Sequence, residues 1–236
     1  MIRVTENFRR IQDLLAETTA AAGRRREAVR LLAVSKSKPA ALVREAASAG
    51  QREFGENFVQ EALNKMDEVD RGDLVWHFIG HLQANKTRPV AENFQWVHTV
   101  DRLKIAERLS RQRPHFAPDL DVCIQVNIDE EKDKSGVAAR DLPELAAAVA
   151  ALPKLRLRGL MCIPRIREGF EAQREPFRRM SELARSLAAA GVQTDTLSMG
   201  MTADFAAAIH EGATIVRIGT ALFGPREYPA RPKGAT

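Results

Sequence analysis

The chain has 236 residues, of which 44% are hydrophobic and 28% are charged, and this length fits one (β/α) barrel or one large α/β domain. No apolar run approaches the roughly 18 residues that span a membrane, and charged side chains interrupt the first segment where a signal peptide needs an apolar stretch. We therefore expect a cytoplasmic protein without a membrane partner. Its single domain is predicted over residues 1–226, with a proline-rich tail over 227–236.

Apolar strand-like segments alternate with amphipathic or alanine-rich helical segments along the whole chain. An opening helix is predicted over 5–22, and strands are predicted at 31–35, 53–55, 75–80, 96–100, 121–128, 155–162, 194–199 and 214–218. Helices are predicted at 40–49, from 58, 103–112, from 141, 170–190 and from 202, with Asp101 and Thr202 as N-caps of two of them. Eight strands, each followed by a helix except the last, whose helix is short, favour a closed barrel over an open sheet. The predicted fold is a single (β/α)8 TIM barrel with an extra N-terminal helix.

The charge pattern and the cysteines argue against several classes of partner. The formal net charge is +5, but the basic residues alternate with acids on the predicted helices and form no nucleic-acid-binding motif, so we expect no nucleic-acid partner. Cys123 and Cys162 lie in apolar segments without metal-ligand spacing, and we interpret them as buried thiols in a reducing compartment. His77 and His81 have the spacing of a zinc protease motif, but Phe78 stands where the catalytic glutamate belongs, so no metal site is predicted.

Lys36 follows the first apolar strand, at the end where barrels and doubly wound folds place their chemistry. Desolvation lowers the pKa of a lysine amine, and the free amine can then attack a carbonyl group. A lysine that extends from a strand edge into solvent is the alternative interpretation.

The turns after the last two predicted strands each offer glycine and a hydroxyl group, namely Ser198, Gly200 and Thr202 in one and Gly219 and Thr220 in the other. In barrels these two turns often bind a phosphate, and glycine lets backbone N–H groups approach it closely. The alternative is that the hydroxyls cap helices and the glycines only form turns.

A lysine opposite a phosphate site is the arrangement that pyridoxal 5'-phosphate requires, because the lysine forms a Schiff base and the site holds the far end of the cofactor. Arg217 on the last strand would then point toward the cofactor ring. A guanidinium group can only donate hydrogen bonds, so the pyridine nitrogen would stay unprotonated and the cofactor would stabilise carbanions less well. A salt-bridged arginine at the rim is the alternative.

These residues resemble the YggS/PROSC family of pyridoxal phosphate homeostasis proteins. The matching segments are LAVSK (32–36), FGENFVQE (54–61), WHFIGHLQANK (76–86), KSG (134–136), GLM (159–161), LSMGMT (197–202) and VRIGTALFG (216–224). The resemblance implies a barrel like the N-terminal domain of alanine racemase, with pyridoxal phosphate on Lys36 and Arg217 facing the pyridine nitrogen. It further implies cofactor contacts from Asn57, Met161, Ser198, Met199, Gly200, Gly219 and Thr220, of which Ser198, Gly200, Gly219 and Thr220 would hold the phosphate.

Two functions are compatible with such a site. The first is a protein without robust catalysis of its own that buffers or delivers pyridoxal phosphate, with apo-enzymes as recipients, as a monomer or weak dimer. The second is a pyridoxal-phosphate-dependent amino-acid racemase, which needs a second acid/base on the opposite face of the ring. The one tyrosine of the chain, Tyr228, lies in the tail, and this favours the first function.

Overall fold

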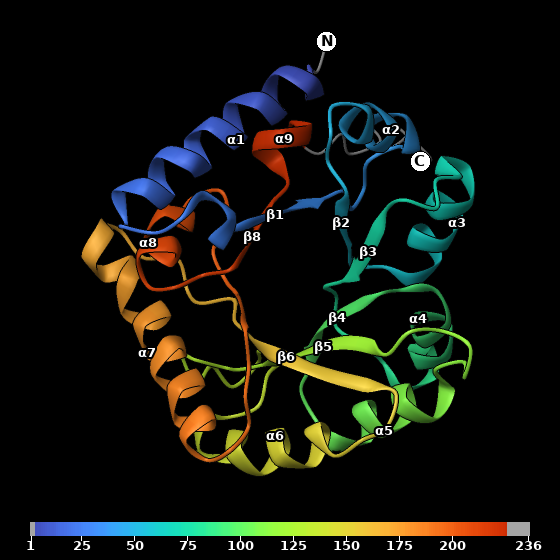
Figure 1. Ribbon diagram of the computed structural model, residues 1–236, viewed down its shortest axis with the longest axis vertical. Coiled ribbons are helices and arrows are strands. Elements are labelled where there is room, and N and C mark those ends of the chain that lie inside the picture. The colour runs from blue at the N-terminus through green and yellow to red at the C-terminus, as the bar shows by residue number, and fades with distance from the viewer. Residues whose placement is uncertain (1–2, 226–236) are drawn as a thin grey trace, which may run out of the picture.

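The computed structural model describes residues 3–225. Eight parallel strands within this range close into one barrel in the order of the chain (Figure 1). They are β1 (Arg30–Val34), β2 (Glu53–Glu56), β3 (Val75–Phe78), β4 (Trp96–Val100), β5 (Leu120–Gln125), β6 (Leu155–Met161), β7 (Thr196–Ser198) and β8 (Ile215–Ile218). The predicted TIM barrel is therefore confirmed.

Helices surround the barrel on its outside (Figure 1). Those that follow the strands are α2 (Ala40–Ser48), α3 (Val59–Val69), α4 (Thr87–Asn93), α5 (Leu103–Gln112), α6 (Leu142–Ala150), α7 (Phe170–Ala189), α8 (Phe205–His210) and α9 (Thr220–Phe223). The additional helix α1 (Val4–Ala21) packs against α2, α8 and α9, and Asn7 Nδ2 donates to Leu222 O at 3.0 Å. Among the described residues, no helix is both long enough and apolar enough to cross a membrane.

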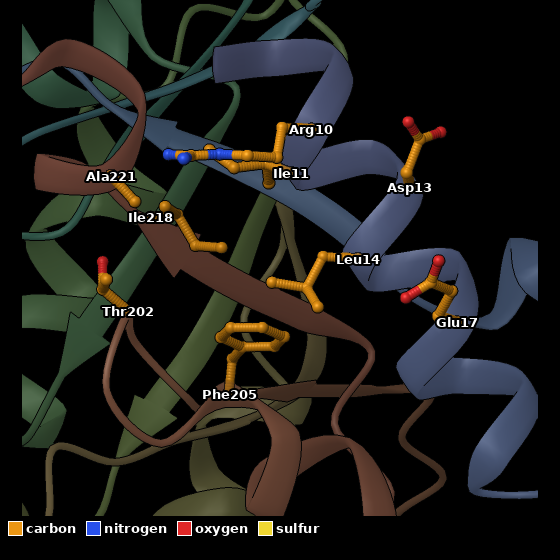
Figure 2. A pocket seen from close by; sticks show the side chains of 9 residues that line it. All are labelled: Arg10, Ile11, Asp13, Leu14, Glu17, Thr202, Phe205, Ile218 and Ala221. Atoms are coloured by element: carbon orange, nitrogen blue, oxygen red, sulfur yellow. The ribbon is translucent and has the colours of Figure 1, made fainter.

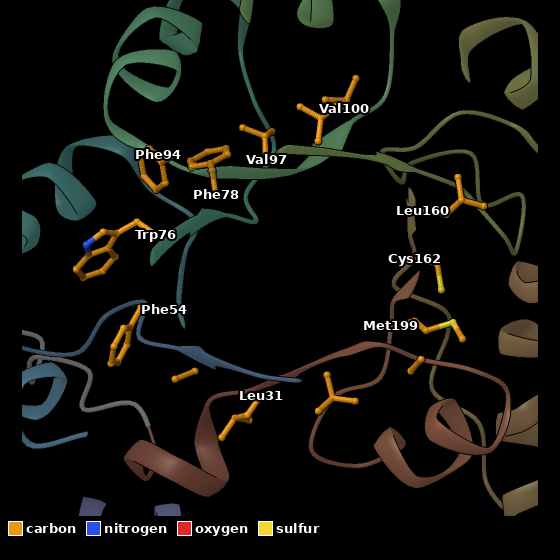
Figure 3. Close-up of a cluster of buried hydrophobic side chains, with 14 of the residues drawn as sticks. Leu31, Phe54, Trp76, Phe78, Phe94, Val97, Val100, Leu160, Cys162 and Met199 are labelled. Atoms are coloured by element: carbon orange, nitrogen blue, oxygen red, sulfur yellow. The ribbon is translucent and has the colours of Figure 1, made fainter. Parts of the chain in front are cut away.

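Two layers of buried side chains hold the barrel together. The outer layer lies between strands and helices (Figure 3), where for example the rings of Phe78 and Phe94 meet edge to face at 5.5 Å. The inner layer fills the barrel itself and contains Leu32, Trp96, Cys123, Met161 and Ile215. Burial on both faces explains why every residue of β4 and β5 is buried. Each fully buried large apolar side chain contributes about 1.5–3 kcal/mol.

The two cysteines are buried thiols, as predicted. Neither Cys123 nor Cys162 is in a disulfide, and burial raises the pKa of each thiol to about 12. Both therefore remain protonated and unreactive at neutral pH.

Two predicted N-caps are wrong. The helix expected from Thr202 begins at Phe205, and its N-cap position is Asp204, whose Oδ1 accepts a hydrogen bond from Met201 N at 2.6 Å. The N-cap position of α5 is Arg102 instead of Asp101. In addition, β5 ends at Gln125, three residues before the predicted end at residue 128, and Val126 makes only an isolated bridge to Val137. These differences are local and leave the order of strands unchanged.

Candidate cofactor site

All eight strands of the barrel are parallel, so their C-terminal ends meet at one mouth of the barrel. Lys36 follows β1, Asn57 follows β2, and Met161 and Ser198 are the last residues of β6 and β7. Gly200, Gly219 and Thr220 lie in or directly after the turns that leave β7 and β8. The residues predicted from the sequence are therefore brought to the same end of the barrel by the topology.

The backbone on either side of Lys36 is held by a buried ion pair. Lys65 Nζ on α3 contacts Glu56 Oε1 at 2.6 Å and the carbonyl oxygen of Ser35 at 2.7 Å, and the Ser35 hydroxyl donates to the same Glu56 oxygen at 2.6 Å. Ser37 takes a left-handed backbone conformation with φ of 59°, and its N–H donates to Glu61 Oε1 at 2.6 Å. The turn that carries Lys36 is thus fixed from outside the barrel.

Lys36 and the turn after β8 share one cavity. This small cavity, of about 40 Å³, is lined by Val34, Lys36, Lys38, Gly219, Thr220 and Gly224. A Cβ atom at Gly219 would stand 3.0 Å from the carbonyl oxygen of Val34, so glycine allows β8 to leave the barrel close beside β1. The first N–H groups of α9, at Thr220 and Ala221, have no acceptor within the helix. The predicted lysine and one of the two predicted phosphate turns therefore lie together.

The turn after β7 also depends on glycine. Gly200 has φ of 93°, and a Cβ atom there would stand 2.6 Å from Ala208 Cβ on α8. Met199, which precedes it, has a fully buried side chain in the outer layer, between strands and helices (Figure 3). A cofactor at the mouth would therefore meet the backbone of Met199 and not its side chain, whereas Met161 belongs to the inner layer.

Arg217 is buried inside the barrel near this mouth and is held by three acceptors. Its Nη1 donates to Ser198 O at 2.6 Å and to Ser198 Oγ at 2.9 Å, and its Nη2 donates to Cys162 O at 2.8 Å. Its exposed fraction is 4%. The alternative of a salt-bridged rim arginine is therefore wrong. A guanidinium group has about five N–H donors, so donors remain on Nη2 and Nε.

The hydroxyl of Ser198 differs from the sequence prediction. The side chain is fully buried, and its Oγ lies 2.8 Å from His98 Nδ1 as well as 2.9 Å from Arg217 Nη1. Its contacts therefore lie in the barrel interior and not on a phosphate turn. The hydroxyl-bearing residue that shares a cavity with Lys36 is Thr220.

Asn57 offers an unused polar atom at the mouth. Its Oδ1 is buried and has no hydrogen-bond partner among the described residues. The backbone of Asn57 is pressed against Gly80, where a Cβ atom would collide with the carbonyl group of Asn57. Gly80 therefore fixes this residue, and the orphaned amide oxygen fits a site that is built to take a polar ligand.

Sequence reasoning missed the interior position of two histidines, since it considered His77 only as a metal ligand and did not single out His98. His77 and His98 are fully buried, and His77 Nδ1 lies 2.9 Å from His98 Nε2. Burial, helped by the positive charges of Arg217 and Arg30, lowers the pKa of His98 to about 3, and burial likewise holds the pKa of His77 well below its ordinary value. Both imidazoles are therefore neutral at physiological pH. The available signal in the sequence was a histidine within each of two mostly apolar strands, β3 and β4.

His81 lies apart from His77. It is exposed at the mouth, where its Nδ1 is 3.0 Å from Ser135 Oγ, while His77 is buried inside the barrel. Among residues 3–225, no three His, Cys, Asp or Glu side chains are grouped to hold a metal ion.

A larger cavity, of about 590 Å³, lies between α1 and the outside of the barrel. Side chains from α1 face Ile218, Ala221, Thr202 and Phe205 across it (Figure 2). It borders the turns after β7 and β8, and Lys36 is not among the residues that line it. We therefore assign the candidate site to the mouth of the barrel.

Comparison with known proteins first identifies the class. The profile of the family described as "Alanine racemase, N-terminal domain" matches residues 4–227. An alanine racemase of Clostridium difficile has the same fold, with a TM-score of 0.70 at 13% identity, over 93% of this chain and 57% of that one. The barrel is thus of the alanine racemase N-terminal type.

More similar relatives identify the family. The pyridoxal phosphate homeostasis protein of Pseudomonas aeruginosa is 57% identical over 98% of this chain and 99% of its own length, and that of Escherichia coli K12 is 50% identical over 95% and 97%. The solved structure of PipY from Synechococcus elongatus with PLP bound has a TM-score of 0.78 at 39% identity, over 89% of this chain and all of that one. The chain belongs to the family of pyridoxal phosphate homeostasis proteins.

Proposed function

We propose that this protein binds pyridoxal phosphate at the mouth of the barrel through Lys36 and takes part in the homeostasis of the cofactor, as a reservoir that releases it to other enzymes. The observation that carries the proposal is the cavity in which Lys36, Gly219 and Thr220 lie together. When bound, the cofactor supplies an aldehyde that condenses reversibly with a lysine amine.

The residues at the mouth fit each part of this cofactor. Thr220 and the first N–H groups of α9 supply donors for a phosphate. The orphaned Asn57 Oδ1 supplies an acceptor at the same end of the barrel. Arg217 retains donors for the ring nitrogen, and because it cannot give up a proton the nitrogen would remain unprotonated. In this proposal Ser198 supports Arg217 and does not contact the phosphate.

Storage is a better match to the site than racemisation. A racemase requires a second acid/base on the other face of the ring, and residues 3–225 contain no tyrosine to take that role, since Tyr228 lies outside the described residues. An arginine at the ring nitrogen also makes the cofactor a weaker electron sink than a carboxylate would. The name of the Pseudomonas aeruginosa and Escherichia coli relatives points the same way.

Borohydride trapping tests the attachment site. Protein loaded with pyridoxal phosphate is reduced, digested and mapped by mass spectrometry, and we expect the label on the peptide that contains Lys36. Lys38→Arg is the matched control, because it replaces the other lysine of the same cavity and should leave the labelling intact. Labelling of Lys38 or Lys134 in place of Lys36 would contradict the assignment.

Two further measurements separate a reservoir from an enzyme. Loaded protein mixed with an apo-enzyme should restore activity even when a trap for free pyridoxal phosphate is present. Loaded protein incubated with amino acids in heavy water should exchange the α-proton no faster than free cofactor does. Inversion of an amino acid over many turnovers, lost in Lys36→Ala, would establish the racemase instead.

A further inference from the structure

A continuous line of polar side chains crosses the interior of the barrel. Arg217 Nη1 lies 2.9 Å from Ser198 Oγ, Ser198 Oγ lies 2.8 Å from His98 Nδ1, and His98 Nε2 lies 2.9 Å from His77 Nδ1. His77 Nε2 then faces Glu53 Oε2 at 3.7 Å. We call these five residues the polar line. It begins at the mouth, where β7 ends, and finishes at Glu53, the first residue of β2 at the opposite end of the barrel.

The chemistry of the side chains gives this line a direction. A guanidinium group only donates, so the Ser198 hydroxyl oxygen accepts from Arg217 and its own hydrogen is available for His98 Nδ1. A neutral His98 that accepts at Nδ1 carries its proton on Nε2 and donates it to His77 Nδ1. A neutral His77 then presents an Nε2–H group to Glu53.

The far end of the line favours this direction over the reverse. Glu53 Oε1 is paired with Arg30 at 2.7 Å, which favours the carboxylate form against the burial that raises the pKa of this group. Neither Glu53 Oε2 nor His77 Nε2 has a hydrogen-bond partner among the described residues. In the reverse direction a lone pair of His77 would face that carboxylate oxygen. The Ser198 hydroxyl would also receive two donors and have no acceptor in the line for its own hydrogen.

We propose that His98 and His77 are positioning residues, which hold the Ser198 hydroxyl as the acceptor that fixes Arg217 for the cofactor ring. Only the statement that Arg217 is held for the cofactor ring rests on the proposed function. The direction of the polar line is a property of the protein without cofactor. The three hydrogen bonds from Arg217 to His77 favour one arrangement of their members, whereas His77 Nε2 and Glu53 Oε2 face each other at 3.7 Å without a hydrogen bond.

Nitrogen-15 NMR of the histidine rings in the protein without cofactor tests the direction. We expect both His77 and His98 to be neutral with the proton on Nε2, between about pH 6 and pH 8. A proton on Nδ1 of either ring, or a charged ring, would overturn the proposal. This measurement does not depend on pyridoxal phosphate binding.

The effect on the cofactor is tested from the far end of the line. Glu53→Gln removes the charge next to His77 without touching the mouth, and we expect it to weaken pyridoxal phosphate binding about three- to tenfold, within the usual range of coupling through a network. It should also shift the absorption maximum of the bound cofactor. Asp121→Asn is the matched control, because Asp121 pairs with Arg156 and Arg158 outside the line and should leave affinity and spectrum unchanged.

The outcomes separate this proposal from the proposed function. Equal behaviour of Glu53→Gln and Asp121→Asn would overturn the positioning role while pyridoxal phosphate binding stands. If the wild-type protein fails to bind the cofactor, the proposed function and the role of Arg217 in it both fall, and the histidine protons still report the direction of the line. If Glu53→Gln does not fold, Ser198→Ala cuts the line beside Arg217 and must give the same spectral shift, or the proposal is wrong.

Discussion

The interior histidines predict that the protein loses stability in mild acid. His98 is neutral in the folded protein with a pKa of about 3, because burial and the charges of Arg217 and Arg30 disfavour the imidazolium form. In the unfolded chain its pKa is about 6.5. Between these two pKa values the unfolded state therefore binds a proton that the folded state does not bind. The stabilising contribution is fully present above the unfolded pKa and is lost as the pH falls below it.

The magnitude follows from that difference. Below about pH 6.5 each further pH unit costs about 1.4 kcal/mol for one such histidine, so His98 alone removes about 2 kcal/mol of the free energy of unfolding at about pH 5. His77 acts in the same direction. Glu53 and Glu56 act in the opposite direction, because burial raises the pKa of both carboxyl groups and they take up protons more readily when folded. Domains are typically stable by about 5–15 kcal/mol, so the loss is measurable.

Urea unfolding followed by circular dichroism at several pH values between about 5 and 8 measures this loss. The decisive comparison is between the wild-type protein and His98→Gln, in which the titrating group is gone while Glu53 and Glu56 remain. The variant starts less stable, but its free energy of unfolding should fall less steeply in acid, by about 1.4 kcal/mol per pH unit below pH 6.5. Parallel pH profiles for the two proteins would refute the reasoning, since they would mean that His98 does not titrate differently in the two states.

Three further predictions follow from the mouth of the barrel and its supports. Thr220→Ala should weaken binding of pyridoxal phosphate by about 1–3 kcal/mol and leave binding of pyridoxal, which lacks the phosphate, unchanged; equal losses in equilibrium titrations of the two ligands would show a role in folding alone. Lys65→Met should lower the free energy of unfolding by about 3–5 kcal/mol in urea titrations, because it leaves the buried Glu56 unpaired. The double variant Glu56→Gln/Lys65→Met should recover most of that loss, and no recovery would argue against the ion pair. Gly80→Ala should cost about 1–3 kcal/mol because its new Cβ collides with the carbonyl group of Asn57, whereas Gly72→Ala, with nothing within 4 Å, should be neutral in the same assay.

The order of strands and helices could be predicted from the sequence because it depends on local signals. Eight apolar segments separated by helical ones predict the closed barrel, and the ends of β4 and of α5 agree with the predicted bounds. Lys36 was recognisable because its place directly after a buried strand is a matter of neighbours in the chain. The same holds for Gly200, whose φ of 93° reflects a turn that only glycine forms easily.

The surroundings of the candidate site were decided by the tertiary structure. In a closed barrel both faces of every strand are buried, so alternation along a strand does not reveal which residues point inward. The sequence therefore predicts Ser198 as a phosphate ligand. Its hydroxyl instead contacts His98, which is 100 residues away in the chain, across the interior of the barrel. Met199, one residue further, points outward into the layer below the helices. The partners of Arg217, Ser198 and Cys162, lie at the ends of two different strands, β7 and β6, and meet Arg217 only when the barrel closes. Contacts between such distant segments leave no periodic signal in the chain.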